Sequence, residues 1–256
     1  MEFGPASIGS PALAGLEQLH KFKVTTSEVA FGRGVYMSNS LAKEVGEVAK
    51  KFKISLSIHA PYYINLVSED IEKKKASIKR ILDTCERGYY LNAKWIVFHA
   101  AYYGKRSKEE VYNIVKKEVI EMQKKIKENK WETILCPETT GKLSQFGELD
   151  ELLKLSKETG CGICVDFAHL KARNIGKIDY DEVMKKIKDV KYLTCHFSGI
   201  VWGAKGERHH ELTKEKDLVE LFTYLKKYKI NTRIINESPD VFGDTLKSMK
   251  IWEKMK

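Results

Sequence analysis

Long apolar runs, a basic leader segment and paired cysteine motifs are all missing from this sequence of 256 residues. No apolar run approaches the roughly 20 residues that a membrane-spanning helix needs. No basic region followed by an apolar core opens the chain, as it would in a secretory signal. The single Cys-x-x-Cys spacing, Cys161 to Cys164, has no second pair to complete a zinc knuckle, and five cysteines are an odd number. We therefore expect reduced, buried cysteines and a cytoplasmic protein without membrane contacts.

Arginine is also scarce, because only seven of the 45 basic residues are arginines. The net charge of +10 suits a polyanionic partner such as DNA. Many of the lysines, however, are interspersed with glutamates on predicted helix faces, a pattern that is also typical of proteins from hot environments. Charge alone therefore favours a nucleic-acid partner only slightly.

A short apolar run followed by an amphipathic stretch recurs eight times along the chain. The runs have the length and composition of buried parallel strands. Eight such units in 256 residues match the size of a (β/α)8 TIM barrel, so we predict one α/β domain over residues 1–256. No Gly-x-Gly-x-x-Gly motif follows the first strand, which argues against the alternative of an open doubly wound sheet.

The predicted strands are Glu2–Ala6, Glu28–Gly32, Ile54–Ile58, Trp95–Phe98, Thr133–Cys136, Gly162–Val165, Tyr192–Cys195 and Arg233–Ile235. The predicted helices are Leu13–His20, Asn39–Lys51, Glu69–Tyr90, Lys108–Glu128, Phe146–Glu158, Tyr180–Asp189, Glu215–Tyr228 and Phe242–Lys254.

Six of the predicted strands run into a residue whose side chain can bind a metal ion. The carboxyl ends of the strands of a barrel meet at one rim, where barrel enzymes have their active sites. One such residue alone is more often structural, but six at one rim are a strong signal. A histidine one helical turn after the sixth strand and two residues of the loop after the seventh add further candidates. The nine candidate ligands are His59, His99, Glu138, Asp166, His169, His196, Glu207, His209 and Glu237.

Nine ligands are too many for one ion, so we predict several ions at this rim. A mixed set of histidines and carboxylates suits Zn²⁺, with Mn²⁺ and Fe²⁺ as alternatives. A carboxylate such as Glu138 can bridge two ions, and ions about 3.5–4 Å apart are the usual arrangement for displacement at phosphorus. His20 and His210 are interpreted as exposed or packed histidines and not as ligands, and we expect the loop Gly203–Gly206 to be flexible.

The motifs at these positions resemble those of the endonuclease IV family of apurinic/apyrimidinic endonucleases. They are HAPYYIN, FHAAYY, PETTGK, VDFAHLKAR, HFSG, GERHH and NESPD, in the order and spacing of that family. The resemblance implies a barrel that holds three zinc ions and cuts double-stranded DNA on the 5′ side of abasic sites. It implies a first ion on His59, His99 and Glu138, a second on Glu138, Asp166, His196 and Glu237, and a third on His169, Glu207 and His209.

The same resemblance implies roles for residues around the metals. Glu138 and Glu237 would lie beside the attacking water and act as the catalytic residues. The loop after the first histidine penetrates DNA in that family, which makes Tyr62 and Tyr63 the candidate inserted pair. Arg33 and Arg208, in loops of the same rim, are further candidates for contacts with DNA. We expect a monomer that is associated with the nucleoid.

One position departs from the family pattern at a candidate ligand, because Glu207 stands where aspartate is usual. Two alternative functions stay open. A sugar isomerase or epimerase of the related xylose isomerase-like barrels would use only Glu138, Asp166, His196 and Glu237, around a single ion. A barrel that binds damaged DNA without cutting it is the other alternative. The additional histidines favour the nuclease, because a one-metal sugar enzyme does not need them.

Overall fold

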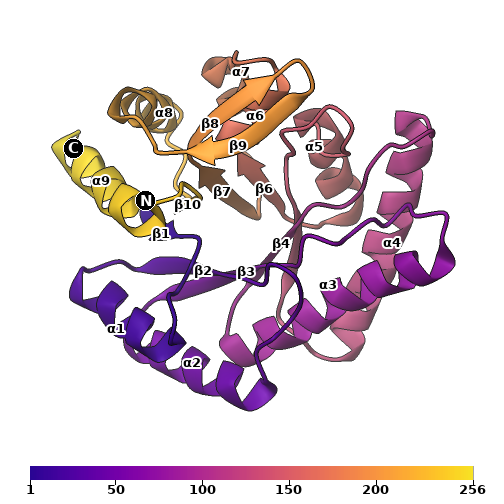
Figure 1. The fold of residues 1–256 in the computed structure, drawn as a ribbon, viewed down its shortest axis with the longest axis horizontal. Coiled ribbons are helices and arrows are strands. Elements are labelled where there is room, and N and C mark those ends of the chain that lie inside the picture. Colours follow the sequence, from indigo (N-terminus) through magenta and orange to yellow (C-terminus); the bar gives the residue numbers. More distant parts are fainter. Residues whose placement is uncertain (256) are drawn as a thin grey trace.

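Eight parallel strands alternate with helices around a central barrel in the computed structural model, which describes residues 1–255 (Figure 1). The strands form two four-stranded sheets, in the orders β2-β3-β4-β5 and β1-β10-β7-β6. Their bounds are β1 (Glu2–Pro5), β2 (Thr26–Ala30), β3 (Ser55–His59), β4 (Trp95–Phe98), β5 (Ile134–Pro137), β6 (Ile163–Asp166), β7 (Leu193–Phe197) and β10 (Arg233–Asn236). The barrel predicted from the sequence is confirmed.

The two sheets meet at two seams, which close the barrel. At the seam between β1 and β2, the Ser27 hydroxyl donates to the Pro5 carbonyl at 2.9 Å. A Cβ atom at Gly4 would lie 2.0 Å from a carbonyl oxygen of β2, so only glycine allows this close approach. At the other seam, Glu138 forms a parallel bridge with Cys164. The closed barrel brings the carboxyl ends of all eight strands to one rim.

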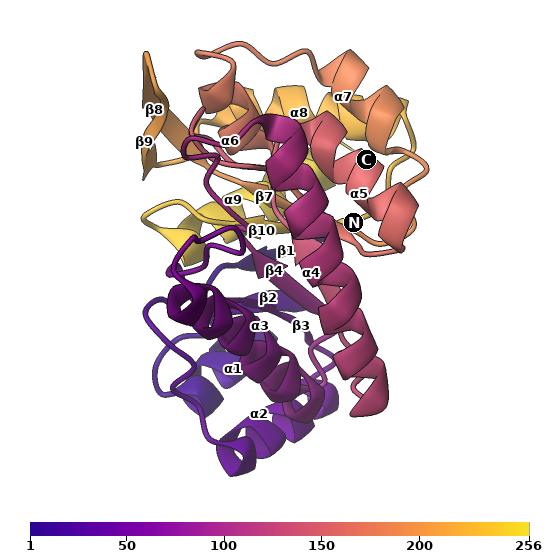
Figure 2. The same cartoon turned by 90° about the vertical axis from the view of Figure 1, so that its right-hand side faces the viewer.

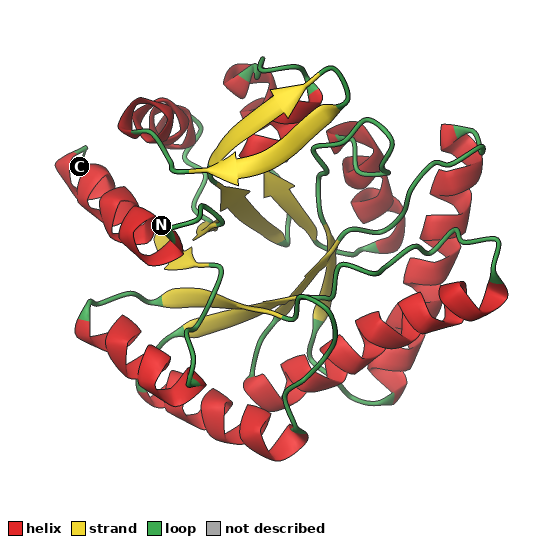
Figure 3. Cartoon of the chain, viewed as in Figure 1, coloured by secondary structure: helices red, strands yellow, loops and turns green. Residues whose placement is uncertain are grey.

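Helices surround the barrel on its outside (Figure 3). Two of them, α2 and α4, have the bounds predicted from the sequence, and the others differ by three residues or fewer at either end. Their bounds are α1 (Ala12–Lys21), α2 (Asn39–Lys51), α3 (Ile71–Leu91), α4 (Lys108–Glu128), α5 (Leu149–Thr159), α7 (Tyr180–Ile187), α8 (Glu215–Lys227) and α9 (Val241–Lys254). No helix among residues 1–255 is both long and apolar enough to cross a membrane.

Three elements at the rim, a short helix and the two strands of a hairpin, were not predicted. The short helix α6 (Phe167–Arg173) follows β6 directly, and β8 (Gly199–Gly203) and β9 (Gly206–Glu211) form an antiparallel hairpin after β7. Figure 2 shows this hairpin projecting beyond one edge of the barrel. The Glu207 amide donates to the Gly141 carbonyl at 3.0 Å, and Lys142 forms a bridge with Gly206. The predicted flexible loop Gly203–Gly206 is therefore the tight turn of a hairpin that hydrogen bonds hold against the loop after β5.

The interior of the barrel is more polar than its apolar strands suggest. Side chains alternate along a strand, so the residue two positions before each inward-facing residue of the rim also points inward. By this rule Val97, Cys136 and Cys164 point inward below the rim, where they form a small apolar cluster. Glu28 and Ser57 are buried beside it. All five cysteines of the chain are buried and unpaired, as expected for reduced thiols.

Candidate metal centre

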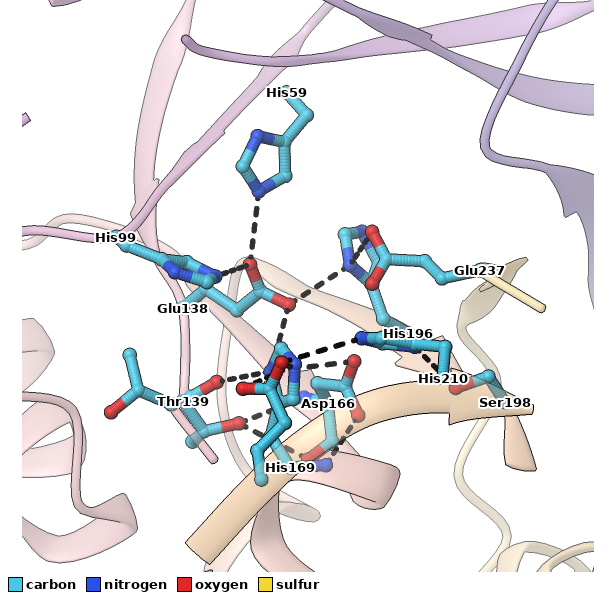
Figure 4. A network of polar contacts seen from close by, with 12 residues as sticks. His59, His99, Glu138, Thr139, Asp166, His169, His196, Ser198, His210 and Glu237 are labelled. Atoms are coloured by element: carbon cyan, nitrogen blue, oxygen red, sulfur yellow. Dashed lines mark hydrogen bonds and ion pairs between the residues drawn. The ribbon is translucent and has the colours of Figure 1, made fainter. Parts of the chain in front are cut away.

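The residues at the strand ends converge on one cavity of about 550 Å³ at the barrel rim. Candidate ligands that line it are His59, His99, His169, Glu207, His210 and Glu237. Glu138, Asp166 and His196 are fully or almost fully buried, and they form contacts with the lining residues (Figure 4). The structure thus brings together eight of the nine candidates named from the sequence, in three adjacent groups.

The first group consists of His59, His99 and Glu138. The Nε2 atoms of His59 and His99 lie 3.1 Å and 2.8 Å from the same oxygen, Glu138 Oε2. Two donors that share a zinc ion at about 2.0–2.2 Å lie about 3.0–3.5 Å apart, so these separations are close to those of a common ion. His59 Nδ1 lies 2.7 Å from the Ala60 carbonyl oxygen. A carbonyl oxygen can only accept a hydrogen bond, so Nδ1 is the donor. When the ring is neutral, as metal binding requires, the lone pair of His59 therefore lies on Nε2 and faces the first group.

The second group gathers around the other oxygen of Glu138. His196 Nδ1 lies 3.0 Å from Glu138 Oε1 and 3.1 Å from Glu237 Oε1. Asp166 caps α6 by accepting from the His169 amide through Oδ1 at 2.8 Å, which leaves Oδ2 directed toward the group. Each oxygen of Glu138 therefore faces a different group, which is the geometry that a bridging carboxylate needs.

The third group lies between α6 and the hairpin. His169 Nδ1 donates to the Thr139 carbonyl at 3.0 Å, and its Nε2 faces Glu207 Oε2 at 3.6 Å. His210 Nε2 lies 4.0 Å from Glu207 Oε1, and His210 Nδ1 is 2.6 Å from the Ser198 hydroxyl. These separations are wider than those of the first two groups.

His210 takes the place that the sequence analysis assigned to His209. Regular alternation would put Glu207 and His209 on one face of β9. Trp202 pairs with Glu207 and Val201 pairs with His209, so Arg208 is an extra residue that forms a bulge. The bulge turns His210 toward Glu207 and leaves His209 exposed to solvent. The structure thus places His210, and not the predicted ligand His209, beside Glu207, since strand pairing that the sequence does not reveal decides which face each histidine occupies.

Buried polar atoms without a hydrogen-bond partner among residues 1–255 mark the second group. They include Glu138 Oε1, Asp166 Oδ2 and His196 Nδ1. They lie within ion-pair distance of a neighbour, as His196 Nδ1 and Glu138 Oε1 do at 3.0 Å, and cations that these atoms coordinate would offset the remaining cost of their burial. The residues present therefore fit divalent metal ions, with nitrogen and oxygen donors that suit Zn²⁺, Mn²⁺ or Fe²⁺.

The charges of the metal-free centre are strongly coupled. Burial alone lowers the pKa of His59, but Glu138 outweighs it and raises the pKa to about 9. Burial also lowers the pKa of His169, and Asp166 and Glu138 raise it to about 9. Burial raises the pKa of Glu237, but the neighbouring His196 lowers it to about 2. Without metal, protons on the imidazoles therefore balance the carboxylates.

The predicted DNA-contacting residues lie at the mouth of the cavity or near it. Tyr62 lines the cavity and is 64% exposed, and the adjacent Tyr63 is 62% exposed. The Tyr62 amide donates to the Gly32 carbonyl at 2.9 Å, which holds the loop after β3 beside the loop that carries Arg33. Arg33 and Arg208 are exposed, and neither has an ion-pair partner among residues 1–255.

Comparisons with known proteins agree with this architecture. A family model described as a xylose isomerase-like TIM barrel matches residues 16–255. An uncharacterized protein of Methanocaldococcus jannaschii is 36% identical over 99% of this chain and 97% of its own length. The "Probable endonuclease 4" of Aquifex aeolicus is 26% identical over 66% of this chain and 64% of its own length. The resemblance to the endonuclease IV family is thereby confirmed at low identity.

Solved structures with this fold include proteins of two different activities. Endonuclease IV from Thermus thermophilus superposes with a TM-score of 0.72 at 19% identity, covering 99% of this chain and 98% of that one. D-Psicose 3-epimerase from Clostridium cellulolyticum also reaches 0.72, at 14% identity and 99% coverage of both chains. At such identities the likeness shows the fold alone. With its matched family model and its relatives, the chain belongs to the xylose isomerase-like TIM barrel family.

Proposed function

We propose that this protein is a metal-dependent DNA-repair endonuclease, which hydrolyses the phosphodiester on the 5′ side of abasic sites. The observation that carries the proposal is the presence of three adjacent groups of ligands, with one carboxylate, Glu138, facing two of them. A sugar isomerase needs only the middle group. The name "Probable endonuclease 4" borne by several relatives supports the same function.

Divalent ions in such a centre would neutralise charge on the phosphate oxygens and lower the pKa of a bound water toward neutrality. Glu237 is the ligand best placed to orient that water, because its side chain is 19% exposed and lines the cavity. With a pKa near 2 in the metal-free protein, Glu237 is ionised at neutral pH and accepts hydrogen bonds. Glu138 is buried beneath, where it holds the first two groups together.

The mouth of the cavity suits a DNA backbone. An abasic nucleotide lacks its base, so turning it into a pocket costs less than extruding an intact nucleotide. The exposed rings of Tyr62 and Tyr63 would then stack in the gap that remains in the duplex. Arg33 and Arg208 have free guanidinium groups with which to contact flanking phosphates.

The deciding experiment is incision of a duplex with one abasic site, labelled at the 5′ end of the damaged strand, by protein loaded with Zn²⁺. We expect one product, cut on the 5′ side of the site. Glu138→Gln should abolish the cut, whereas Glu118→Gln should retain it. Glu118 is a matched control, because it is a buried glutamate that pairs with Lys74 at 2.7 Å on the outside of the barrel.

Three outcomes separate the proposal from its alternatives. Tight binding of abasic DNA without incision would indicate a damage-binding barrel. One bound ion per chain together with epimerisation of ketoses would indicate a sugar enzyme. Incision of undamaged and abasic duplex at equal rates would contradict the proposed specificity.

A further inference from the structure

Glu28 is a carboxylate buried in the barrel interior that the metal groups do not include. It lies in the middle of β2, and its exposed fraction is 0%. Charged side chains are rarely so deeply buried without a close partner, because removal from water costs several kcal/mol. The Ser57 hydroxyl donates to Glu28 Oε2 at 2.7 Å, and His196 Nε2 lies 3.3 Å from Oε1 and 3.4 Å from Oε2.

The contact with Glu28 keeps a hydrogen on one particular nitrogen of His196. A carboxylate accepts hydrogen bonds and cannot donate them, so His196 Nε2 bears a hydrogen. The opposite nitrogen, Nδ1, faces Glu138 and Glu237 at 3.0 Å and 3.1 Å, and a cation bound by the second group would replace the hydrogen on this nitrogen. Glu28 thus fixes both the tautomer and the orientation of the ring at the centre of the site.

Glu28 differs in charge from the groups that orient the other histidines. His59 and His169 donate to the backbone carbonyls of Ala60 and Thr139, which carry no net charge. A carboxylate behind an imidazole makes the facing nitrogen more basic, and it adds a negative charge near the cations. His169 Nδ1 also lies 3.5 Å from Asp166 Oδ2, but its hydrogen bond goes to the Thr139 carbonyl, whereas the far nitrogen of His196 has a carboxylate as its hydrogen-bond partner.

Arg233 offers a different partner for Glu28, but its contacts lie elsewhere. Its guanidinium packs 4.9 Å from the centre of the Trp95 ring and donates to the Ser27 carbonyl at 2.9 Å. No ion pair within 4 Å joins Arg233 to Glu28 in the described chain. The hydrogen bonds that Glu28 receives come from Ser57 and His196, which connects it to the metal centre.

We propose that Glu28 is a positioning residue that holds His196 as a metal ligand and raises the affinity of the second group for a divalent cation. The inference rests on the proposed metal centre and not on the reaction, because a nuclease and a one-metal sugar enzyme would both use His196. Glu28 adds a fifth negative charge to the four carboxylates of the centre, Glu138, Asp166, Glu207 and Glu237. That charge is of most value when cations occupy the site.

The test is the affinity of the intact protein for Zn²⁺, measured by competition with a chromophoric chelator in the absence of any substrate. Glu28→Gln keeps the shape of the side chain and removes its charge. We expect one ion to bind roughly 10–100-fold more weakly, the loss typical when an outer partner of a metal-binding histidine is changed, while the other ions keep their affinity. The visible spectrum of the Co²⁺-loaded variant should change for the same ion.

Two further variants isolate the role of Glu28. Ser57→Ala keeps the charge and removes one hydrogen bond, so it should weaken the same ion by less than Glu28→Gln does. Glu118→Gln, the buried glutamate outside the barrel, should change neither affinity nor spectrum. The proposal is overturned if Glu28→Gln binds every ion within twofold of the wild type with an unchanged Co²⁺ spectrum. It is also overturned if all ions weaken equally and the metal-free variant unfolds more readily, since Glu28 would then serve the fold alone.

A failure of the proposed nuclease leaves this test intact. A wild-type protein that binds ions but does not incise abasic DNA would refute the nuclease, while the effect of Glu28→Gln on metal affinity would still be measurable.

Discussion

The stability of the metal-free protein should fall as the pH rises from 6.5 to 8.5. In the folded, metal-free chain the pKa values of His59 and His169 are raised to about 9, whereas an imidazole in the unfolded chain titrates near 6.5. A group whose pKa is raised on folding stabilises the protein fully below its unfolded pKa, and that contribution disappears as the pH approaches the folded value. Both imidazoles therefore lose most of their stabilising contribution within this range, because they lose their protons in the unfolded chain before they do so in the folded one.

The size of the effect follows from the two pKa values. For one imidazole with pKa values of 6.5 and about 9, the linkage relation gives a loss of about 2 kcal/mol between pH 6.5 and pH 8.5. The two imidazoles share Glu138, so their combined loss lies between about 2 and about 4 kcal/mol. Burial alone lowers the pKa of His196, but the surrounding acidic groups raise it, so this imidazole adds a loss of the same sign. Burial also raises the pKa of all five thiols, and they add a loss of the same sign as the pH approaches 8.5, the ordinary pKa of a thiol. The part of the loss between pH 6.5 and pH 7.5 therefore comes mainly from the histidines.

Urea unfolding in the presence of a strong chelator, at pH 6.5, 7.5 and 8.5, measures this loss. His59→Gln should reduce the pH dependence, whereas substitution of an exposed histidine on α1, His20→Gln, should leave it unchanged. With Zn²⁺ bound, the trend should reverse, because metal ligation requires deprotonated imidazoles. A free energy of unfolding that is constant or rises over this range in chelator would refute the charge coupling derived for the site.

Three further predictions concern the ligands and the rim. Glu138→Gln should reduce incision of abasic duplex by at least about 100-fold, because even outer partners of metal ligands contribute 10–100-fold; near-native rates in a gel assay would remove Glu138 from the mechanism. Tyr62→Ala and Tyr63→Ala should each weaken binding of abasic duplex about tenfold in fluorescence anisotropy, since stacking contributes about 1–3 kcal/mol per base, with metal content unchanged. His210→Ala should lose one ion in elemental analysis while His209→Ala keeps it; the opposite result would restore the original assignment.

The fold could be predicted because its strands are buried on both faces and read as apolar runs. The run Trp95–Phe98 has the same bounds in the sequence and in the structure, and so does the helix Lys108–Glu128. The helix start is encoded locally, since Ser107 and Glu110 form a reciprocal capping box. The candidate ligands at the strand ends could also be predicted, because a parallel barrel brings all of its strand ends to one rim.

The hairpin and its ligand could not be predicted in the same way. The strand Gly206–Glu211 is polar and lies half-exposed at the rim, so it lacks the alternation that marks a strand. The choice of His210 over His209 depends on the pairing with β8, which no local pattern shows. The role of Glu28 was missed because its partner His196 is 168 residues away, although a glutamate inside a predicted strand was a visible signal.

The bulge at Arg208 allows β9 to carry one extra residue while Glu207 and His210 stay on the same face of the strand. Glu207 and His210 are three positions apart, yet they share a face because Arg208 is left out of the pairing. A chain that lacked Arg208 would place the same two residues two positions apart, the ordinary spacing for one face of a strand. Deletion of Arg208 would therefore change the spacing of these two residues in the sequence while it keeps them on one face of the strand. Related barrels that differ at this point should be aligned by strand pairing and not by the spacing of their histidines.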